Sequence, residues 1–306
     1  MPAIGCRADG TGGAMVALAD DSLSAVYYNP GALPDVKGDD LVLGSFFIFF
    51  PSEYESQTGY REKNEKNSFA PSFGLSTDRF KPFYFGIAMY GSTGMGFTFK
   101  KDPPHGIHAR FDSEMGNMFL SPTVSYKISE KLGIGAGFNI TYGKMKTQMP
   151  IPTGEVLCLD VDGMSYGMNI GILYRPIKSV SFGLRWRSPQ KAVLKGDADF
   201  SGIKDHVRVT QYWPHLLSAG FSYRPTENLV LLFDFEWINY SRFGSKSHYS
   251  SEKLTFLNSP FIKDIKDAKR IHAGFEYDVN EMFIWRVGYL YNPRTPCPCR
   301  HKRAMT

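Results

Sequence analysis

Strict alternation between apolar and small or polar residues is the feature that most limits how this chain can fold. Residues 132–142 place large apolar side chains and Ala at even positions, and Gly, Asn or Thr at odd positions. The same alternation recurs in residues 229–237 and 283–291. A β-strand has this period of two, and a tilted strand of about nine residues is long enough to cross a bilayer. The pattern therefore predicts strands with one face turned to an apolar medium.

A strand ending in tyrosine, followed by a short polar turn and another strand, recurs along the chain. These tyrosines are Tyr126, Tyr174, Tyr223 and Tyr277. The connections at residues 91–110, 146–160 and 239–267 are long by comparison. Short turns at one rim and long loops at the other are typical of outer-membrane barrels. Counting the strand patterns gives about eleven strands between residues 41 and 291.

Two fold classes fit this alternation: a soluble β-sandwich or barrel, whose core face also alternates, and a transmembrane β-barrel. Tyrosines beside the short turns favour the membrane barrel, because aromatic side chains gather at lipid interfaces. The glycine-rich opposite faces suit a lumen that is closely approached by a plug. The sequence has no run of about 18 apolar residues, so a spanning helix is excluded. We predict an all-β fold, an antiparallel transmembrane β-barrel.

The first forty residues lack this alternation and are rich in Gly, Ala and Ser. Residues 20–22 (Asp-Asp-Ser) suit a helix cap, and residues 29–31 (Asn-Pro-Gly) predict a turn. We expect residues 1–40 to fold as a hatch, or plug, inside the lumen, packed on the glycines of residues 133–137. The barrel then occupies residues 41–293, and residues 294–306 form a tail without a strand pattern.

Charges on the predicted inner faces come in both signs, and we expect them to form a balanced network that tethers the hatch. The set is Arg185, Arg187, Asp234, Glu236, Glu276 and Arg286. An uncompensated charge in a poorly hydrated interior is costly. An alternative role for a basic member of the set is to bind a substrate carboxylate. His272, placed inward beside Glu276, is expected to make a structural hydrogen bond.

No signature of an enzyme, a cofactor or a nucleic-acid partner is found. The chain has no Gly-rich phosphate loop, no HExxH and no GxSxG motif. Its net charge of +5 owes much to the basic stretch 300–303, so it is not interpreted as a nucleic-acid footprint. Cys297 and Cys299 give only a weak metal or redox signal. We expect no catalytic residues, no metal and no cofactor.

Several motifs in a fixed order resemble the FadL/toluene-transporter family of outer-membrane proteins. The motifs lie at residues 12–14, 19–21, 29–30, 166–174, 187–189, 194–196, 239–243 and 266–274. Residue 31 is Gly, where the family usually has Ala. Family barrels have fourteen strands, so the resemblance implies that the last three are absent and that the chain is cut or frame-shifted after Asn292. The residues assigned to the hatch are Gly12, Gly13, Ala14, Asp20, Asp21, Asn29, Pro30 and Gly31.

The resemblance implies passive transport of long-chain fatty acids or other hydrophobic compounds, such as aromatic hydrocarbons, across the outer membrane of a Gram-negative cell. A signal peptide is not found in the sequence. The expected surroundings are outer-membrane lipid and lipopolysaccharide, and the expected state is a monomer with no nucleic-acid partner. The alternative function is a barrel that acts as a secretion or assembly scaffold and shares the hatch motif.

Two further sets of residues are assigned with the resemblance. In the family, ligand passes to a pocket above the hatch and leaves sideways where the third strand kinks. Glycines at residues 91–96 follow the strand at 83–90, and several glycines in a strand signify a bulge or a break. The lateral opening is assigned to Gly91, Ser92, Thr93 and Gly94, with an ordinary strand end as the alternative. The ligand carboxylate is assigned to Lys144, Lys146 and Lys263, because the family's cationic positions fall on Met149 and Phe261 here.

Overall fold

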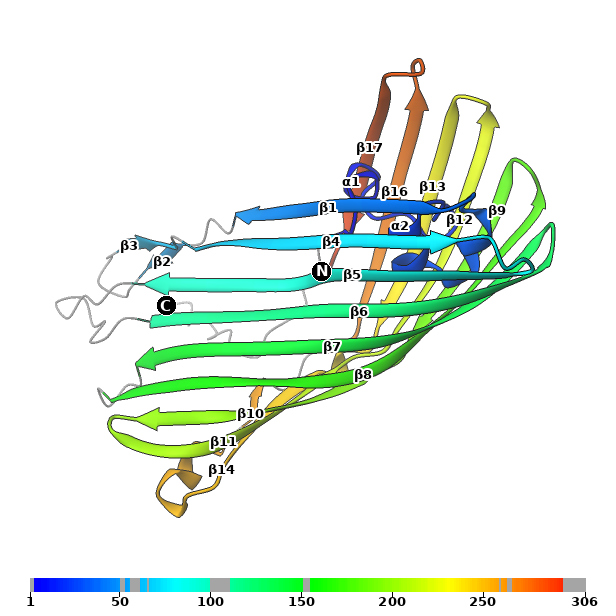
Figure 1. Ribbon diagram of the computed structural model, residues 1–306. Helices are drawn as coiled ribbons and strands as arrows, with labels where there is room; N and C mark the ends of the chain where they lie inside the picture. The colour runs from blue at the N-terminus through cyan, green and yellow to red at the C-terminus, as the bar shows by residue number, and fades with distance from the viewer. Residues whose placement is uncertain are drawn as a thin grey trace.

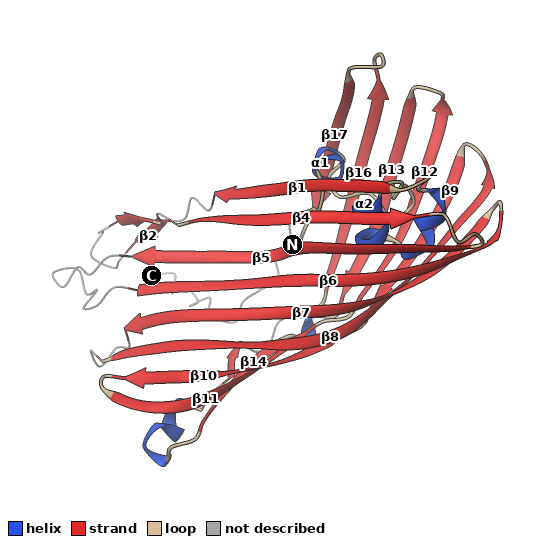
Figure 2. Ribbon diagram, viewed as in Figure 1, coloured by secondary structure: helices blue, strands red, loops and turns tan. Residues whose placement is uncertain are grey.

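A single antiparallel sheet of 15 strands curls around the N-terminal segment (Figures 1 and 2). The computed structural model describes residues 3–49, 53–55, 61–64, 66–99, 111–150, 155–258, 260–262 and 266–293. Among these residues no helix has the length and apolarity that crossing a membrane would require. Lys263, Cys297 and Cys299, to which the sequence assigned possible roles, lie outside the described residues, as does the stretch 294–306.

The N-terminal segment contains two short helices and a 3-10 helix, and most of the other described residues lie in strands. The helices are α1 (Cys6–Gly10), α2 (Ser22–Tyr28), η1 (Pro30–Asp35), η3 (Tyr240–Arg242) and η4 (Glu252–Leu257). The strands are β1 (Asp40–Phe49), β2 (Glu53–Glu55), β3 (Arg61–Lys63), β4 (Asn67–Thr77), β5 (Phe83–Phe99), β6 (Phe111–Ser129), β7 (Leu132–Pro150), β8 (Val156–Ile177), β9 (Val180–Arg187), β10 (Gln190–Phe200), β11 (Ile203–Trp213), β12 (Leu216–Thr226), β13 (Leu229–Ile238), β14 (Gly244–Tyr249), β15 (Pro260–Ile262), β16 (Ala268–Asp278) and β17 (Ile284–Tyr291).

Eleven strands follow one another around the described sheet, in the order β1, β4, β5, β6, β7, β8, β9, β12, β13, β16 and β17. The remaining four strands of this sheet, β10, β11, β14 and β15, pair side by side and extend the later strands beyond short interruptions, while β2 and β3 pair with each other as a separate two-stranded sheet. The interruptions fall at residues 188–189, 214–215 and 239–243. Pro189 and Pro214 lie in two of them, and proline has no N–H to give to a ladder. The eleven strands predicted from the alternation correspond to these eleven positions.

The two faces of the sheet carry opposite kinds of side chain, as predicted. On β7 the apolar Ile134 and Phe138 are 38% and 46% exposed, whereas Asn139 on the other face is 0% exposed. The exposed apolar row continues onto the neighbouring strands, while the inward face packs on the hatch. A soluble sandwich would bury the apolar face instead, so the transmembrane alternative is the one that fits.

The outer ends of β5, β7 and β8 are longer than the sequence indicated, and they occupy part of the expected loops 91–110 and 146–160. On β8 the outward side chains are Tyr166 and Met164 at 57% and 56% exposure, followed by exposed Asp162 and Asp160. The inward side chains there form an apolar cluster with β10, β11 and β14. Polarity thus inverts beyond Met164, because the outward face leaves the lipid for a polar medium. The period-two search missed these ends because their outward face is charged.

The tyrosines beside the short turns form an outward-facing row at one rim. Tyr126, Tyr174, Tyr223 and Tyr277 are 39–45% exposed. Rings at this depth have an apolar body in lipid and a hydroxyl near water, which is the arrangement of an interfacial girdle. The row fixes the short-turn rim as one membrane boundary.

Candidate functional site

The hatch lies on the concave side of the sheet, with α1 beside β17 and α2 beside β4 and β5 (Figure 1). Asp21 is the N-cap of α2, and its carboxylate accepts from the backbone N–H of Ser24 at 2.8 Å. Asn29 caps η1 in the same way, by accepting from the N–H of Gly31 at 3.0 Å. The amide of Asn29 also donates to the carbonyls of Val16 and Ile172, at 2.7 and 3.0 Å. One side chain therefore ties two hatch segments to the wall.

Glycines on the wall lie where the hatch approaches the strands most closely. A Cβ added to Gly171 would lie 2.8 Å from both the N and Cδ atoms of Pro30. A Cβ on Gly183 would collide with the carbonyl of Val16, and one on Gly288 with the backbone of Gly12. The glycines expected to receive the hatch were those of residues 133–137. The expectation is confirmed for Gly133 and Gly135, where an added Cβ would collide with the carbonyls of Gly31 and Pro30, whereas a Cβ on Gly137 would meet side chains of the wall.

Gly31 of the hatch is itself a close approach. A Cβ there would lie 2.8 Å from Gly171 O and 2.9 Å from Gly133 O. This contact leaves no room for a side chain at residue 31. The hatch and the wall meet here through backbone atoms on both sides.

Carboxylates of the wall hold the hatch by its backbone and by one arginine. Asp234 on β13, 2% exposed, accepts from the N–H groups of Met15 and Val16 at 2.8 and 2.9 Å. Glu276 on β16 pairs with hatch residue Arg7 at 2.6 Å and with Arg286 at 2.5 Å. The predicted tethering network is confirmed for these groups.

The other polar hatch residues complete this network. Arg7 also pairs with Asp20. Burial raises the pKa of the Asp20 carboxyl above its usual range, and the neighbouring Arg7 opposes that shift. Gly12 accepts a hydrogen bond from His272, whose Nδ1 lies 2.7 Å from the Gly12 carbonyl. The structural role expected for His272 is confirmed by this contact.

A cavity of about 260 Å³ lies between the hatch and the interrupted strands. Hatch residues Gly13, Val16, Tyr27 and Tyr28 form one side of it. Its other side comes from the three interruptions and their flanks, and includes Arg187, Ser188, Trp213, Pro214, Tyr240 and Phe243. The cavity therefore lies where the strands of the wall are interrupted.

Both rings and charges line the cavity. Tyr27 and Tyr28 meet edge to face with ring centroids 4.7 Å apart, and Trp213 meets Phe243 at 5.7 Å. Glu236 pairs with Arg185 at 2.9 Å and with Arg270 at 3.3 Å. A mostly apolar pocket with a few fixed polar groups is the usual composition of a small-molecule site.

The wall next to this cavity has an incomplete ladder between β4 and β5. Pairing of these strands ends at Ser72 with Tyr90, whereas β5 remains paired with β6 as far as Phe99 with Phe111. The β5–β6 register shifts between Gly91 and Thr93, which places a bulge at Ser92. The alternative of an ordinary strand end at Gly91 is therefore wrong, since β5 continues to Phe99, and the expected irregularity in the strand is present as this bulge. Pro71 is the first β4 residue beyond the ladder and has no N–H to donate.

An aromatic pair connects the cavity with this gap. Phe119 on β6 lines the cavity, and it stacks on Tyr90 with ring centroids 5.2 Å apart. Tyr90 is the last β5 residue paired with β4. Beyond the gap, the Asn64 side chain bridges to β5 by donating to Gly96 O at 3.1 Å and accepting from Thr98 N at 3.0 Å. The gap between β4 and β5 is therefore bounded at both ends by hydrogen bonds.

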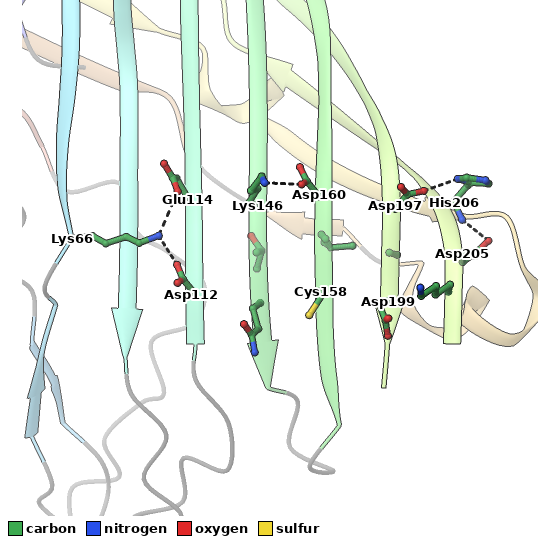
Figure 3. Close-up of a pocket in the computed structure, with 15 residues that line it drawn as sticks. Lys66, Asp112, Glu114, Lys146, Cys158, Asp160, Asp197, Asp199, Asp205 and His206 are labelled. Atoms are coloured by element: carbon green, nitrogen blue, oxygen red, sulfur yellow. Dashed lines mark hydrogen bonds and ion pairs between the residues drawn. The ribbon is translucent and has the colours of Figure 1, made fainter. Parts of the chain in front are cut away.

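Lys144 and Lys146, assigned to a ligand carboxylate, lie on the outward face of β7 and do not line the central cavity. Lys146 points to Asp160, with Nζ 2.9 Å from the carboxylate, at the edge of an open hollow of about 810 Å³ (Figure 3). His206 and Asp197 meet there at 2.9 Å as well. These exposed pairs belong to the polar band beyond the lipid, where the outward face meets a charged medium.

Sequence reasoning missed most of the residues that line the cavity. Trp213, Tyr240 and Phe243 fall at strand ends, where a period-two pattern carries no information. The available signal was the position of Pro189 and Pro214 inside long strand patterns, because proline inside a strand indicates an edge, a bulge or a break.

Comparisons with known proteins agree with this architecture. A family model described as "Outer membrane protein transport protein (OMPP1/FadL/TodX)" matches residues 5–304. A Pseudomonas aeruginosa FadL homologue superposes with a TM-score of 0.80 at 16% identity, covering 97% of this chain and 81% of that chain. The Ralstonia pickettii toluene transporter TbuX gives 0.79 at 16% identity, covering 96% and 87%. The Pseudomonas putida toluene transporter TodX gives 0.74 at 16% identity, covering 97% and 86%. A search of curated protein sequences finds no match.

Proposed function

Because the chain belongs to the OMPP1/FadL/TodX family of outer-membrane transport proteins, we propose that it takes up small hydrophobic molecules through the central cavity and releases them sideways between β4 and β5. The family consists of Gram-negative outer-membrane transport channels, so the expected location and the absence of an enzymatic role are confirmed. Monoaromatic compounds are the proposed substrates. Passage is passive, since hydrophobic affinity alone moves the solute from water to lipid.

The observation that carries the proposal is a ring-lined cavity closed on one side by the hatch. Its volume of about 260 Å³ is below the roughly 300–1,000 Å³ of pockets for drug-sized ligands, which favours a one-ring molecule over a long acyl chain. Two of the similar structures are toluene transporters, which is consistent with a ligand of this size. A scaffold protein would have no use for such a cavity.

Lateral release is supported by a comparison of two gaps in the wall. The ladder is also interrupted between β8 and β10, from Met168 to Asp162. That gap is filled by the buried Gln190 side chain, which accepts from Thr141 at 3.0 Å and Ser165 at 3.1 Å. The β4–β5 gap has the Phe119–Tyr90 pair leading to it from the cavity. Exit between β4 and β5 would leave the hydrogen bonds of Gln190 intact.

Replacing Gly94 with Phe is expected to block release, because a bulky ring in the β5 gap would obstruct the opening. Toluene uptake by cells that express the variant should fall toward that of cells without the protein, while insertion into the membrane stays normal. Ile87→Phe is the matched control: it enlarges a residue of β5 where the strand is paired on both sides. Unchanged uptake by a normally inserted Gly94→Phe variant would contradict lateral release at this gap.

The function itself is tested by comparing uptake of labelled toluene and labelled palmitate in a Gram-negative host with and without the full chain. We expect faster toluene uptake and a smaller effect on palmitate. Faster palmitate uptake alone would favour the long-chain fatty acids that the resemblance implied. The scaffold alternative predicts no effect on either solute and copurification of protein partners.

A further inference from the structure

Arg187 is the one cavity-lining cation without a carboxylate partner among the described residues. Its side chain is buried, with the residue 7% exposed, and it lines the cavity beside Ser188. Arg185 and Arg270 share the carboxylate of Glu236, and both N–H contacts of Asp234 go to the hatch backbone. Three arginines thus face two carboxylates in the cavity lining, and both carboxylates are already engaged.

The contacts of the Arg187 guanidinium are with the hatch, and they leave some of its N–H donors unused. One Nη donates to the Tyr27 carbonyl at 3.1 Å, and the guanidinium carbon lies 4.6 Å from the centre of the Tyr27 ring. Arg185 donates to the same carbonyl at 3.2 Å. Within the described part of the chain the buried Nε of Arg187, like that of Arg185, has no hydrogen-bond partner. A guanidinium offers five N–H donors, so this group has capacity for a carboxylate.

We propose that the cavity takes a monoanionic aromatic carboxylic acid, with the carboxylate on Arg187 and the ring among Tyr27, Tyr28 and Phe119. The inference rests on the proposed function and narrows its substrate class. A single negative charge balances the excess arginine, since a buried cation without a partner is unfavourable. The ring fills the space lined by aromatic side chains, whose edges and faces favour aromatic contacts. A long acyl chain satisfies the charge but exceeds the space.

A structural role for Arg187 is the competing explanation, since cations are favourable near the last carbonyls of a helix such as α2. Arg185 already donates to the Tyr27 carbonyl, so a second arginine is not needed for that purpose. Replacing a purely structural arginine would change the affinity for charged and neutral ligands alike. Replacing an arginine that binds the ligand would weaken the binding of charged ligands only.

The test uses two probes of nearly the same shape, 4-methylbenzoate and para-xylene, which differ by a carboxylate in place of a methyl group. Binding to the purified full chain in detergent is followed by tryptophan fluorescence, because Trp213 lines the cavity. We expect Arg187→Met to weaken 4-methylbenzoate binding by about 10- to 100-fold, the loss typical of a hydrogen bond to a charged group, and to leave para-xylene almost unchanged. Arg187→Lys should retain part of the preference for the acid. Lys195→Met, which removes an exposed cation that does not line the cavity, should change neither.

Equal losses for both probes in Arg187→Met, or no loss for either, would overturn the inference. So would wild-type protein that binds para-xylene as tightly as 4-methylbenzoate, a measurement that needs no folded variant. The two levels of the proposal fail separately. If cells take up para-xylene and the protein shows no preference for 4-methylbenzoate, the proposed transport function stands and the aromatic acid is rejected as its substrate class. If the protein binds 4-methylbenzoate tightly but cells transport neither probe, the binding site stands and the proposed transport function is rejected.

Discussion

Asp234→Ala is expected to loosen the hatch and make the outer membrane permeable to small hydrophilic solutes. The carboxylate accepts from two consecutive backbone N–H groups, at 2.8 and 2.9 Å, in a site that is 2% exposed. Without it, each buried N–H loses its partner at a cost of about 1–3 kcal/mol. The segment they hold lies against the wall glycines: a Cβ on Gly183 would collide with the Val16 carbonyl, and one on Gly220 would lie 2.8 Å from Val16 Cβ. Its release opens a path along the barrel axis.

The measurement is the rate at which nitrocefin reaches a periplasmic β-lactamase in cells that express each variant. Asp234→Asn keeps an acceptor oxygen and should leak less than Asp234→Ala. Asp197→Ala removes a carboxylate from the exposed outer band and serves as the control with wild-type permeability. A barrier as tight in Asp234→Ala as in the wild type, at equal amounts of inserted protein, would show that this carboxylate does not hold the hatch closed.

Gly171→Ala is expected to destabilise the protein by about 1–3 kcal/mol, the usual cost of an extra methyl group in a tightly packed site. The new Cβ would lie 2.8 Å from two atoms of Pro30 and would also collide with the Asn29 side chain. Asn29 cannot turn away without giving up its hydrogen bonds to Val16, Ile172 and Gly31. The strain therefore falls on the hatch as a whole.

Thermal unfolding in detergent and protease cleavage of the hatch measure this effect together. Gly44→Ala is the matched control: a Cβ there approaches only the Ser72 hydroxyl, at 3.0 Å, and that hydroxyl is free to rotate. We expect a lower unfolding temperature and faster hatch cleavage for Gly171→Ala alone. Equal behaviour of the two variants would mean that the hatch adjusts to the wall at little cost.

The membrane-spanning part of the wall could be predicted from sequence because lipid imposes a simple rule on it. Every second side chain, such as Ile134 and Phe138, must be apolar, and the small inward residues leave room for the hatch. The rule ends where the lipid ends. Beyond Met164 the outward residues of β8 become Asp162 and Asp160, so the same strand continues without the pattern that identified it.

The cavity could be predicted only in outline, because its residues come together through register and strand breaks. Alternation places all the inner charges on the same face, and it does not distinguish Arg185, which pairs with Glu236, from Arg187, which does not. That difference depends on how β9, β12 and β13 align. Lys146 is a second charge whose partner could not be predicted from sequence. It pairs with Asp160 across the β7–β8 ladder, in a region that was expected to be a loop.

The three strand interruptions, at residues 188–189, 214–215 and 239–243, lie side by side and give the wall a compliant zone. Widening an intact ladder requires several backbone hydrogen bonds to break together. Here many of those bonds are already missing, so the wall can yield by a small shift of Ser188, Pro214 or Phe243. Ligands of somewhat different width then fit the same barrel without breaking the paired parts of its ladder. Backbone amides next to the three interruptions should exchange with solvent deuterium sooner than those on the paired parts of the same strands.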